Sequence, residues 1–220
     1  TEQAELGLTP NLVVGADGLV REPQPNGNVL FYRNDPDGRA LVTKILSNGR
    51  VQLYEGPRDQ ERKVRQIWPN GEMMLYEGPH DEERVVRRIY PDGIVEFFEG
   101  PRDEERKVRT TFPDGHEEFY DGPHPQERKV RVEYPDGREE FYEGPQNQAH
   151  KVRIEYPDGR VQYFEGPQGQ ERTMRVEWGS GAVEFYEGPG GQERKVRTTF
   201  ANGRVQYFEG PRGLERLVNQ

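Results

Sequence analysis

The stretch of sequence that decides the fold reads Tyr134-Pro135-Asp136-Gly137-Arg138-Glu139-Glu140-Phe141-Tyr142-Glu143-Gly144-Pro145. A short loop and a phrase close to Glu-Arg-Lys-Val-Arg follow it in most copies, and the pattern then starts again after 22 residues. A fixed period of this length is typical of repeat proteins, in which each unit is one small supersecondary element. The chain is therefore predicted to be a repeat array.

Two glycine series define the units, and no insertion or deletion interrupts either of them. The first series is Gly49, Gly71, Gly93, Gly115, Gly137, Gly159, Gly181 and Gly203. The second series is Gly56, Gly78, Gly100, Gly122, Gly144, Gly166, Gly188 and Gly210, each followed by proline. An array of this kind presents like residues in rows, whereas an enzyme needs unlike residues that converge at one place. The period therefore predicts an extended surface.

Each unit contains two segments that favour β-strands, residues 128–134 and 138–143 in the copy quoted above, because both are rich in aromatic and β-branched residues. Pro135, Asp136 and Gly137 suit a three-residue hairpin turn that ends with glycine in the left-handed region. We expect the same structural turn at Gly71, Gly93, Gly115, Gly137, Gly159, Gly181 and Gly203. Both links are too short for a crossover helix, so successive strands must be antiparallel. The predicted fold class is all-β, an elongated antiparallel β-meander solenoid of β-hairpin repeats in a single-layer twisted sheet.

The domain organisation follows from where the period begins. Residues 1–25 lack it and are predicted to form a non-repetitive tail or cap. Residues 26–46 read as a degenerate first repeat, in which Asn34 and Asp35 replace the glycine–proline pair, and residues 47–220 hold eight repeats. Terminal units of arrays commonly differ in this way, because they cap the stack.

A three-residue turn also predicts a register. It places Tyr134 opposite Arg138, and counting outward then sets Val132 against Glu140 and Arg131 against Phe141. Continued further, the same count sets Val130 against Tyr142 and Lys129 against Glu143. On this register Val130, Tyr134 and Tyr142 share one face as an apolar stripe, and Phe141 lies with Arg131 on the other face.

Composition limits the classes of function. Only 31% of the residues are apolar and 32% are charged, which leaves little material for a thick core. The chain has no cysteine, and we expect a soluble protein, with an intracellular location favoured. Because the first residue is Thr1, earlier removal of an N-terminal targeting segment is an open alternative.

The sequence offers no convincing catalytic or metal-binding cluster. His80 and His124 occupy equivalent positions two units apart and cannot share an ion. The many glutamates lie on a predicted open sheet beside lysine and arginine, whereas a general acid needs a desolvating cleft. We therefore expect no enzymatic activity and no cofactor or metal.

A row of arginines that includes Arg109, Arg131 and Arg153 runs beside aromatic residues, a combination that can bind single-stranded nucleic acid. Most units bring at least as much negative charge as positive, and the net charge of the chain is −9. This balance argues against nucleic acid or an anionic membrane surface as the partner.

Two families share the turn phrases of this chain. Tyr156-Pro157-Asp158-Gly159 and Tyr142-Glu143-Gly144 resemble elements of MORN repeats, which form antiparallel hairpins stacked into an elongated sheet. The chain departs from that family in its seven-residue spacing between the paired glycines and in its second strand, which lacks the glycine-rich, tryptophan-containing half of the MORN consensus. Phe112-Pro113-Asp114-Gly115 resembles, more weakly, a phrase of the single-layer G-box sheet of centriolar T-complex-10-like proteins. Both resemblances imply a scaffolding or partner-binding module.

The sequence predicts a non-enzymatic scaffold or protein-interaction platform that presents rows of aromatic, valine, arginine and glutamate side chains. The candidate partner-binding residues are Tyr54, Tyr76, Phe98, Tyr120, Tyr142, Phe164, Tyr186 and Phe208, with Val108, Val130 and Val152. Cross-strand packing that only stabilises the sheet is the alternative role for the aromatic row. Self-association into larger assemblies and binding of an extended polyanion remain the alternative functions.

Overall fold

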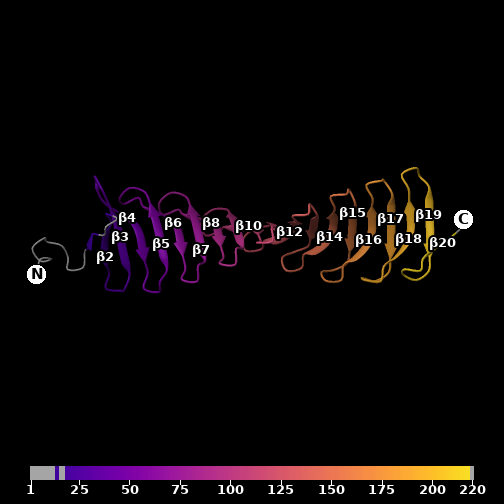
Figure 1. Cartoon of the computed structure of the whole chain (residues 1–220), viewed down its shortest axis with the longest axis horizontal. Helices are drawn as coiled ribbons and strands as arrows, with labels where there is room; N and C mark the ends of the chain where they lie inside the picture. The colour runs from indigo at the N-terminus through magenta and orange to yellow at the C-terminus, as the bar shows by residue number, and fades with distance from the viewer. Residues whose placement is uncertain (1–12, 15–17, 219–220) are drawn as a thin grey trace, which may run out of the picture. The chain divides into compact units, whose positions relative to one another are not determined.

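The computed structural model describes residues 13–14 and 18–218, and every regular element in them is a β-strand. The chain divides into a first unit that ends at Lys107 and a second unit that begins at Val108. In each unit, strands that are neighbours in the sequence pair antiparallel, as Figure 1 shows. The predicted all-β meander of successive hairpins is therefore confirmed for each unit.

The strands of the first unit are β1 (Val13–Val14), β2 (Val20–Pro23), β3 (Val29–Asp35), β4 (Gly38–Ile45), β5 (Val51–Glu55), β6 (Arg62–Ile67), β7 (Met73–Glu77), β8 (Arg84–Ile89) and β9 (Val95–Glu99). The division between the units falls within β10 (Arg106–Thr111). The second unit continues with β11 (Glu117–Asp121), β12 (Arg128–Glu133), β13 (Glu139–Glu143), β14 (His150–Glu155), β15 (Val161–Glu165), β16 (Arg172–Glu177), β17 (Val183–Glu187), β18 (Arg194–Thr199), β19 (Val205–Glu209) and β20 (Arg216–Val218). Strand β2 lies within the segment predicted to be a tail or cap, and it pairs with β3. The division into tail, degenerate repeat and eight repeats stays a prediction.

The short turn of each hairpin is closed by backbone hydrogen bonds. In the copy between β12 and β13, the N–H of Tyr134 donates to the carbonyl oxygen of Arg138 over 2.9 Å. The N–H of Gly137 donates to the carbonyl oxygen of Tyr134, also over 2.9 Å. Gly137 has a φ of 83°, in the region that favours glycine. Arg131 then lies opposite Phe141, and Val132 opposite Glu140, which confirms the inner part of the predicted register.

The outer part of the predicted register is wrong, because a β-bulge follows the long link, as between β11 and β12 and between β13 and β14. Tyr142 pairs with Lys151 of the following strand, not with Val130. Lys129 pairs with Tyr120 of the preceding strand, and Val130 is the extra residue of the bulge. Since side chains alternate between faces with a period of two, one extra residue moves every side chain beyond it to the opposite face.

The bulge therefore separates residues that were expected to share an apolar stripe. We call the side that carries Lys129, Val132 and Tyr142, with their equivalents in other repeats, the lysine face. The opposite side, which carries Val130 and Phe141 with their equivalents, is the valine face. On the lysine face, the ammonium of Lys129 lies 4.6 Å from the centre of the Tyr142 ring.

Six of the nine buried side chains in the described ranges occupy one position of the repeat, on the lysine face. Val132, Ile154 and Val176 are 2%, 5% and 7% exposed, and Thr110 and Thr198 take the same position in their repeats. Among the described residues of each unit, no second layer of structure covers this row. The long side chains of the same face shield it instead, which explains how a chain so poor in apolar residues builds a sheet.

Candidate interaction surfaces

A glutamate near the end of most long loops completes the bulge of the preceding repeat. The backbone N–H of Lys63 donates to Oε1 of Glu83 over 2.9 Å, and the N–H of Thr173 donates in the same way to Glu193 over 2.9 Å. Burial alone would raise the pKa of Glu83, but backbone N–H groups, including that of Lys63, outweigh burial and lower it. These carboxylates therefore have a structural role between neighbouring repeats.

The arginine that follows this glutamate anchors the next loop. Arg128 donates from its guanidinium to the carbonyl oxygen of Gly144 over 3.1 Å, and Arg172 donates to Gly188 over 2.9 Å. The guanidinium of Arg172 also forms an ion pair with Glu165. The charges at these positions hold consecutive repeats together.

On the lysine face, at least four of the eight rings of the predicted aromatic row are covered by the chain's own lysines. In each case the ammonium group of a lysine on the preceding strand lies over the ring, 3.9 to 5.0 Å from the ring centre. The pairs are Lys63 over Tyr76, Lys129 over Tyr142, Lys151 over Phe164 and Lys195 over Phe208. Burial, followed by the hydrogen bond that its hydroxyl donates to Glu140, raises the pKa of Tyr142 well above its ordinary value. These four rings thus pack against the chain's own lysines.

On the valine face, arginines alternate with aromatic rings across the strands. The guanidinium of Arg131 lies 4.3 Å from the centre of the Phe119 ring, and that of Arg153 lies 4.1 Å from Phe141. Arg131 also pairs with Glu133 over 2.8 Å. This arginine row, which could have bound phosphate groups, is stacked on rings and paired with glutamates of the chain itself.

The structure does not bring the two sets of predicted contact residues together. The row from Tyr54 to Phe208 lies on the lysine face, whereas Val108, Val130 and Val152 belong to the valine face. The predicted turn glycines, from Gly71 to Gly203, have φ between 80° and 90°. A role for either row in binding a partner stays a prediction.

A hollow of about 490 Å³ opens on the valine face over β16 to β19. Met174, Phe185, Val196 and Tyr207 provide its apolar lining, with Arg172 at its margin. Met174 and Tyr207 are 38% and 39% exposed, so a large part of both side chains faces solvent. The sequence analysis missed this hollow, although the replacement of valine by the longer methionine at position 174 marks its place.

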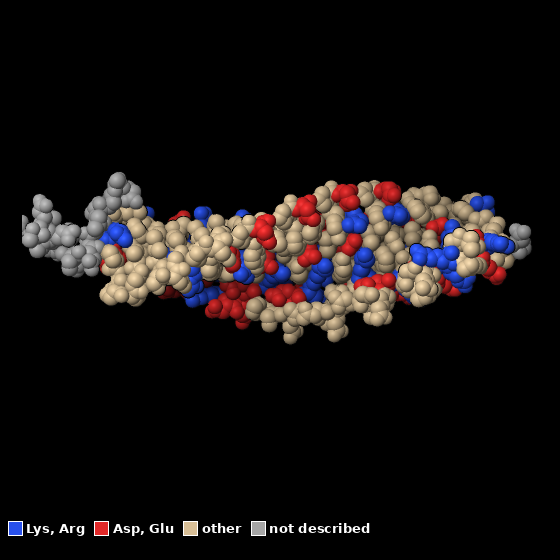
Figure 2. All heavy atoms as spheres, turned by 60° about the horizontal axis from the view of Figure 1, so that its bottom comes forward, with Lys and Arg blue, Asp and Glu red and all other residues tan. Residues whose placement is uncertain are grey.

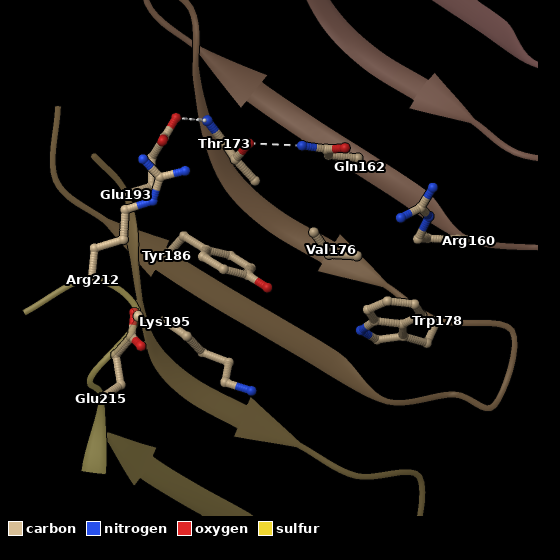
Figure 3. Close-up of a pocket in the computed structure, with 11 residues that line it drawn as sticks. Arg160, Gln162, Thr173, Val176, Trp178, Tyr186, Glu193, Lys195, Arg212 and Glu215 are labelled. Atoms are coloured by element: carbon tan, nitrogen blue, oxygen red, sulfur yellow. Dashed lines mark hydrogen bonds between the residues drawn. The ribbon is translucent and has the colours of Figure 1, made fainter. Parts of the chain in front are cut away.

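A second hollow, of about 520 Å³, opens on the lysine face over Tyr186. Figure 3 shows the Tyr186 ring near the middle of this group, with Val176 and Trp178 beside it and the side chains of Glu193, Lys195 and Arg212 around it. Thr173 stands where five other repeats have a lysine. Substitution of this lysine by a short side chain leaves the space empty.

Neither a metal centre nor a membrane span is found in the described part of the chain. Residues 18–218 contain no group of three or more histidine, aspartate or glutamate side chains placed to hold an ion. No helix that is long and apolar enough to cross a bilayer occurs among the described residues. The expected intracellular location stays a prediction.

Comparison with known proteins returned structural similarities only. No family model matches the chain, and no curated protein sequence matches it either. Among solved structures, the TCP10 domain of Danio rerio CPAP in complex with a STIL peptide is 19% identical, with a TM-score of 0.34 over 94% of this chain and 96% of that one.

The TCP domain of SAS-4 (dCPAP) of Drosophila melanogaster, in complex with a proline-rich motif of Ana2, is 16% identical, with a TM-score of 0.20 over 91% and 89% of the two chains. A TcdB2-TccC3 structure is 11% identical, with a TM-score of 0.18 over 94% of this chain and 14% of that one. The neighbours include the G-box type of domain to which the weaker resemblance pointed. At these TM-scores they assign neither a family nor a function, and the MORN-like resemblance stays a prediction.

Proposed function

We propose that the chain is a non-enzymatic protein-interaction platform that binds an extended, partly apolar segment of a protein partner on its valine face. The observation that carries the proposal is the hollow formed by Met174, Phe185, Val196 and Tyr207. Apolar side chains that stay exposed together on a polar chain are typical of a protein contact. A rim of charged groups, including Arg172 and Glu187, supplies the polar border that such contacts usually have.

The arrangement of charge favours a protein over a polyanion as the partner. Along the arginine row, Arg153 pairs with Glu155 over 3.1 Å and Arg175 with Glu177 over 3.0 Å. Figure 2 shows basic side chains lying beside acidic ones on the face in view. A phosphate backbone on the arginine row would meet these carboxylates as well as the guanidinium groups.

The proposal is tested by panning a phage-displayed random peptide library against the chain. We expect peptides with apolar side chains at alternate positions to be enriched, and their binding to be lost in Val196→Glu. Val130→Glu makes the same change on the same face away from the hollow, and it should retain binding. A double variant, Tyr120→Ala with Tyr142→Ala, tests the predicted aromatic row on the other face.

Circular dichroism must first show that each variant is folded. The proposal is wrong if no peptide is enriched, or if folded Val196→Glu binds the enriched peptides as well as the unchanged protein does. Loss of binding in the double variant alone would transfer the partner site to the lysine face.

Self-association is the second candidate, and it rests on strand β20. Leu217 in this strand is 49% exposed, and β20 pairs with β19 along one edge only within the part of the chain that the structure describes. An open edge of this kind can pair with another copy. Light scattering over a wide concentration range tests the idea, since a mass that stays monomeric at every concentration contradicts it.

A further inference from the structure

The lysine that covers the aromatic ring is replaced in three repeats. Leu41 and Val85 take its position in the first unit, where their aliphatic side chains still offer apolar cover. In the second unit the replacement is Thr173, whose hydroxyl accepts a hydrogen bond from Nε2 of Gln162 over 2.7 Å. No cation–ring contact within residues 18–218 involves Tyr186. The hollow of Figure 3 therefore lies over an uncovered tyrosine ring.

A second substitution in the same repeat uncovers another ring. In three other repeats an arginine after the turn lies over the aromatic residue before it, at 3.7 to 4.2 Å from the ring centre: Arg138 on Tyr134, Arg160 on Tyr156 and Arg204 on Phe200. Ala182 takes this position next to Trp178, which is 39% exposed. The guanidinium of Arg160 lies 5.7 Å from the Trp178 ring, farther than in the three covered copies. The hollow thus combines two aromatic rings that have lost the cations of their own repeat.

We propose that this hollow binds a lysine side chain of a protein partner, with its ammonium over the Tyr186 ring and its alkyl chain against Val176 and Trp178. The proposal goes beyond the proposed function, because this hollow lies on the opposite face of the sheet. The chain itself shows that a lysine fits, because the ammonium groups of Lys129, Lys151 and Lys195 take the equivalent place in their repeats. Attraction between a cation and an aromatic face is strengthened where water is partly excluded.

Charges around the hollow are compatible with a bound ammonium. Glu193 and Glu215 line it, and backbone N–H groups keep the pKa of both below the ordinary value, so both are ionised near neutral pH. Among the cations, Lys195 pairs with Glu184 over 2.9 Å, and the guanidinium of Arg212 donates to the carbonyl oxygen of Gly191. Lys129 and Lys151 already occupy this row one repeat apart, at about twice the ordinary strand spacing of 4.8 Å. A partner lysine bound in the hollow would lie at this same distance from Lys151 and from Lys195, its two neighbours in the row.

The test uses the full chain with Trp68→Phe, which leaves Trp178 as the single tryptophan. Two probes are compared, a short peptide with a central lysine and the same peptide with norleucine, which keeps the alkyl chain and lacks the ammonium. We expect the lysine peptide to change the Trp178 fluorescence and to bind about tenfold more tightly than the norleucine peptide. Equal binding of the two peptides would overturn the proposal.

Three variants sharpen this result. Thr173→Lys restores the chain's own ammonium and should abolish lysine-peptide binding, whereas Thr173→Ala keeps the hollow open and should retain it. Lys129→Thr combined with Arg138→Ala removes both cations of another repeat and should open an equivalent hollow over Tyr142. It should add a second lysine-binding site, detected as a change in stoichiometry by calorimetry. Unchanged lysine binding in Thr173→Lys, or no added site in the folded double variant, would contradict the proposal.

The two proposals fail separately. Peptides selected on the valine face should bind Thr173→Lys as they bind the unchanged chain, because that hollow lies on the opposite side of the sheet. If the selected peptides bind and the lysine peptide does not, the lysine site alone is wrong. If no peptide is selected on the valine face while the lysine peptide binds in the expected way, the proposed function needs revision and the lysine site stands.

Discussion

Replacing Glu83 by alanine tests the idea that loop glutamates join neighbouring repeats. The carboxylate accepts the N–H of Lys63 over 2.9 Å, and it also accepts backbone N–H groups of its own loop. A hydrogen bond to a charged group contributes about 1.5–3 kcal/mol to stability. Glu83 is only half-buried, so water can replace part of the bond. We therefore expect Glu83→Ala to reduce the local stability at the Lys63 amide by about 1.5 kcal/mol, the lower end of this range.

Amide hydrogen exchange measures this loss at the bond itself. At about 1.4 kcal/mol per factor of ten, the Lys63 amide should exchange roughly tenfold faster in Glu83→Ala. Glu82→Ala removes the same charge from the exposed neighbouring position, and it should leave the Lys63 amide unchanged. Glu83→Gln keeps a neutral acceptor and should give an intermediate rate.

Equal exchange of the Lys63 amide in Glu83→Ala and Glu82→Ala would mean that the Glu83 carboxylate does not stabilise the bulge. The sequence also contains the reverse experiment, because Ala149 takes the glutamate position in one repeat. Ala149→Glu should provide an acceptor for the Lys129 amide and stabilise the chain by about 1 kcal/mol.

Three further predictions concern the core, the turns and pH. Ile154→Ala should destabilise the chain by about 2–4 kcal/mol in denaturant unfolding, because it leaves a cavity in the buried row, while half-exposed Val152→Ala should cost less than about 1 kcal/mol. Gly169→Asn should leave the melting temperature nearly unchanged, since Asn147 has a φ of 63° at the same loop position. Gly166→Asn should lower the melting temperature, because a Cβ there would lie 2.7 Å from the carbonyl oxygen of Gln170. Several glutamates have a pKa below the ordinary 4.5 in the folded protein. Their contribution to stability is therefore fully present above pH 4.5, and it should be lost as the pH falls through their lower pKa values in the folded state. A melting temperature that stays constant as the pH is lowered through this range would contradict the last prediction.

Much of the fold could be predicted because its determinants are local. Proline, aspartate and glycine at 135–137 specify the turn, and the turn specifies the first pairs beyond it, such as Arg131 with Phe141. The error lay farther from the turn, where the outer half of β13 pairs with β14 across the long link. Spacing within one repeat carries no direct information about this pairing, which depends on the loop glutamate and arginine of the next repeat.

The two hollows were missed for a different reason. The sequence analysis looked for rows, and both hollows occur where a row is interrupted, at Met174 on one face and at Thr173 and Ala182 on the other. These departures are visible when the repeats are aligned. Their consequence for Tyr186 and Trp178 required knowing which cation lies over which ring, and those contacts join residues of different strands.

By itself, the sequence determined the repeat, the antiparallel order of the strands and the conformation of the short turn. Each of these follows from residues that are close together in the chain, where backbone preferences of proline and glycine and the alternation of side chains decide the outcome. Which residues beyond the bulge share a face depended on contacts between different repeats. The bulge at Val130 forms because its strand must pair with both of its neighbours, and that one extra residue places the valines opposite the aromatic row.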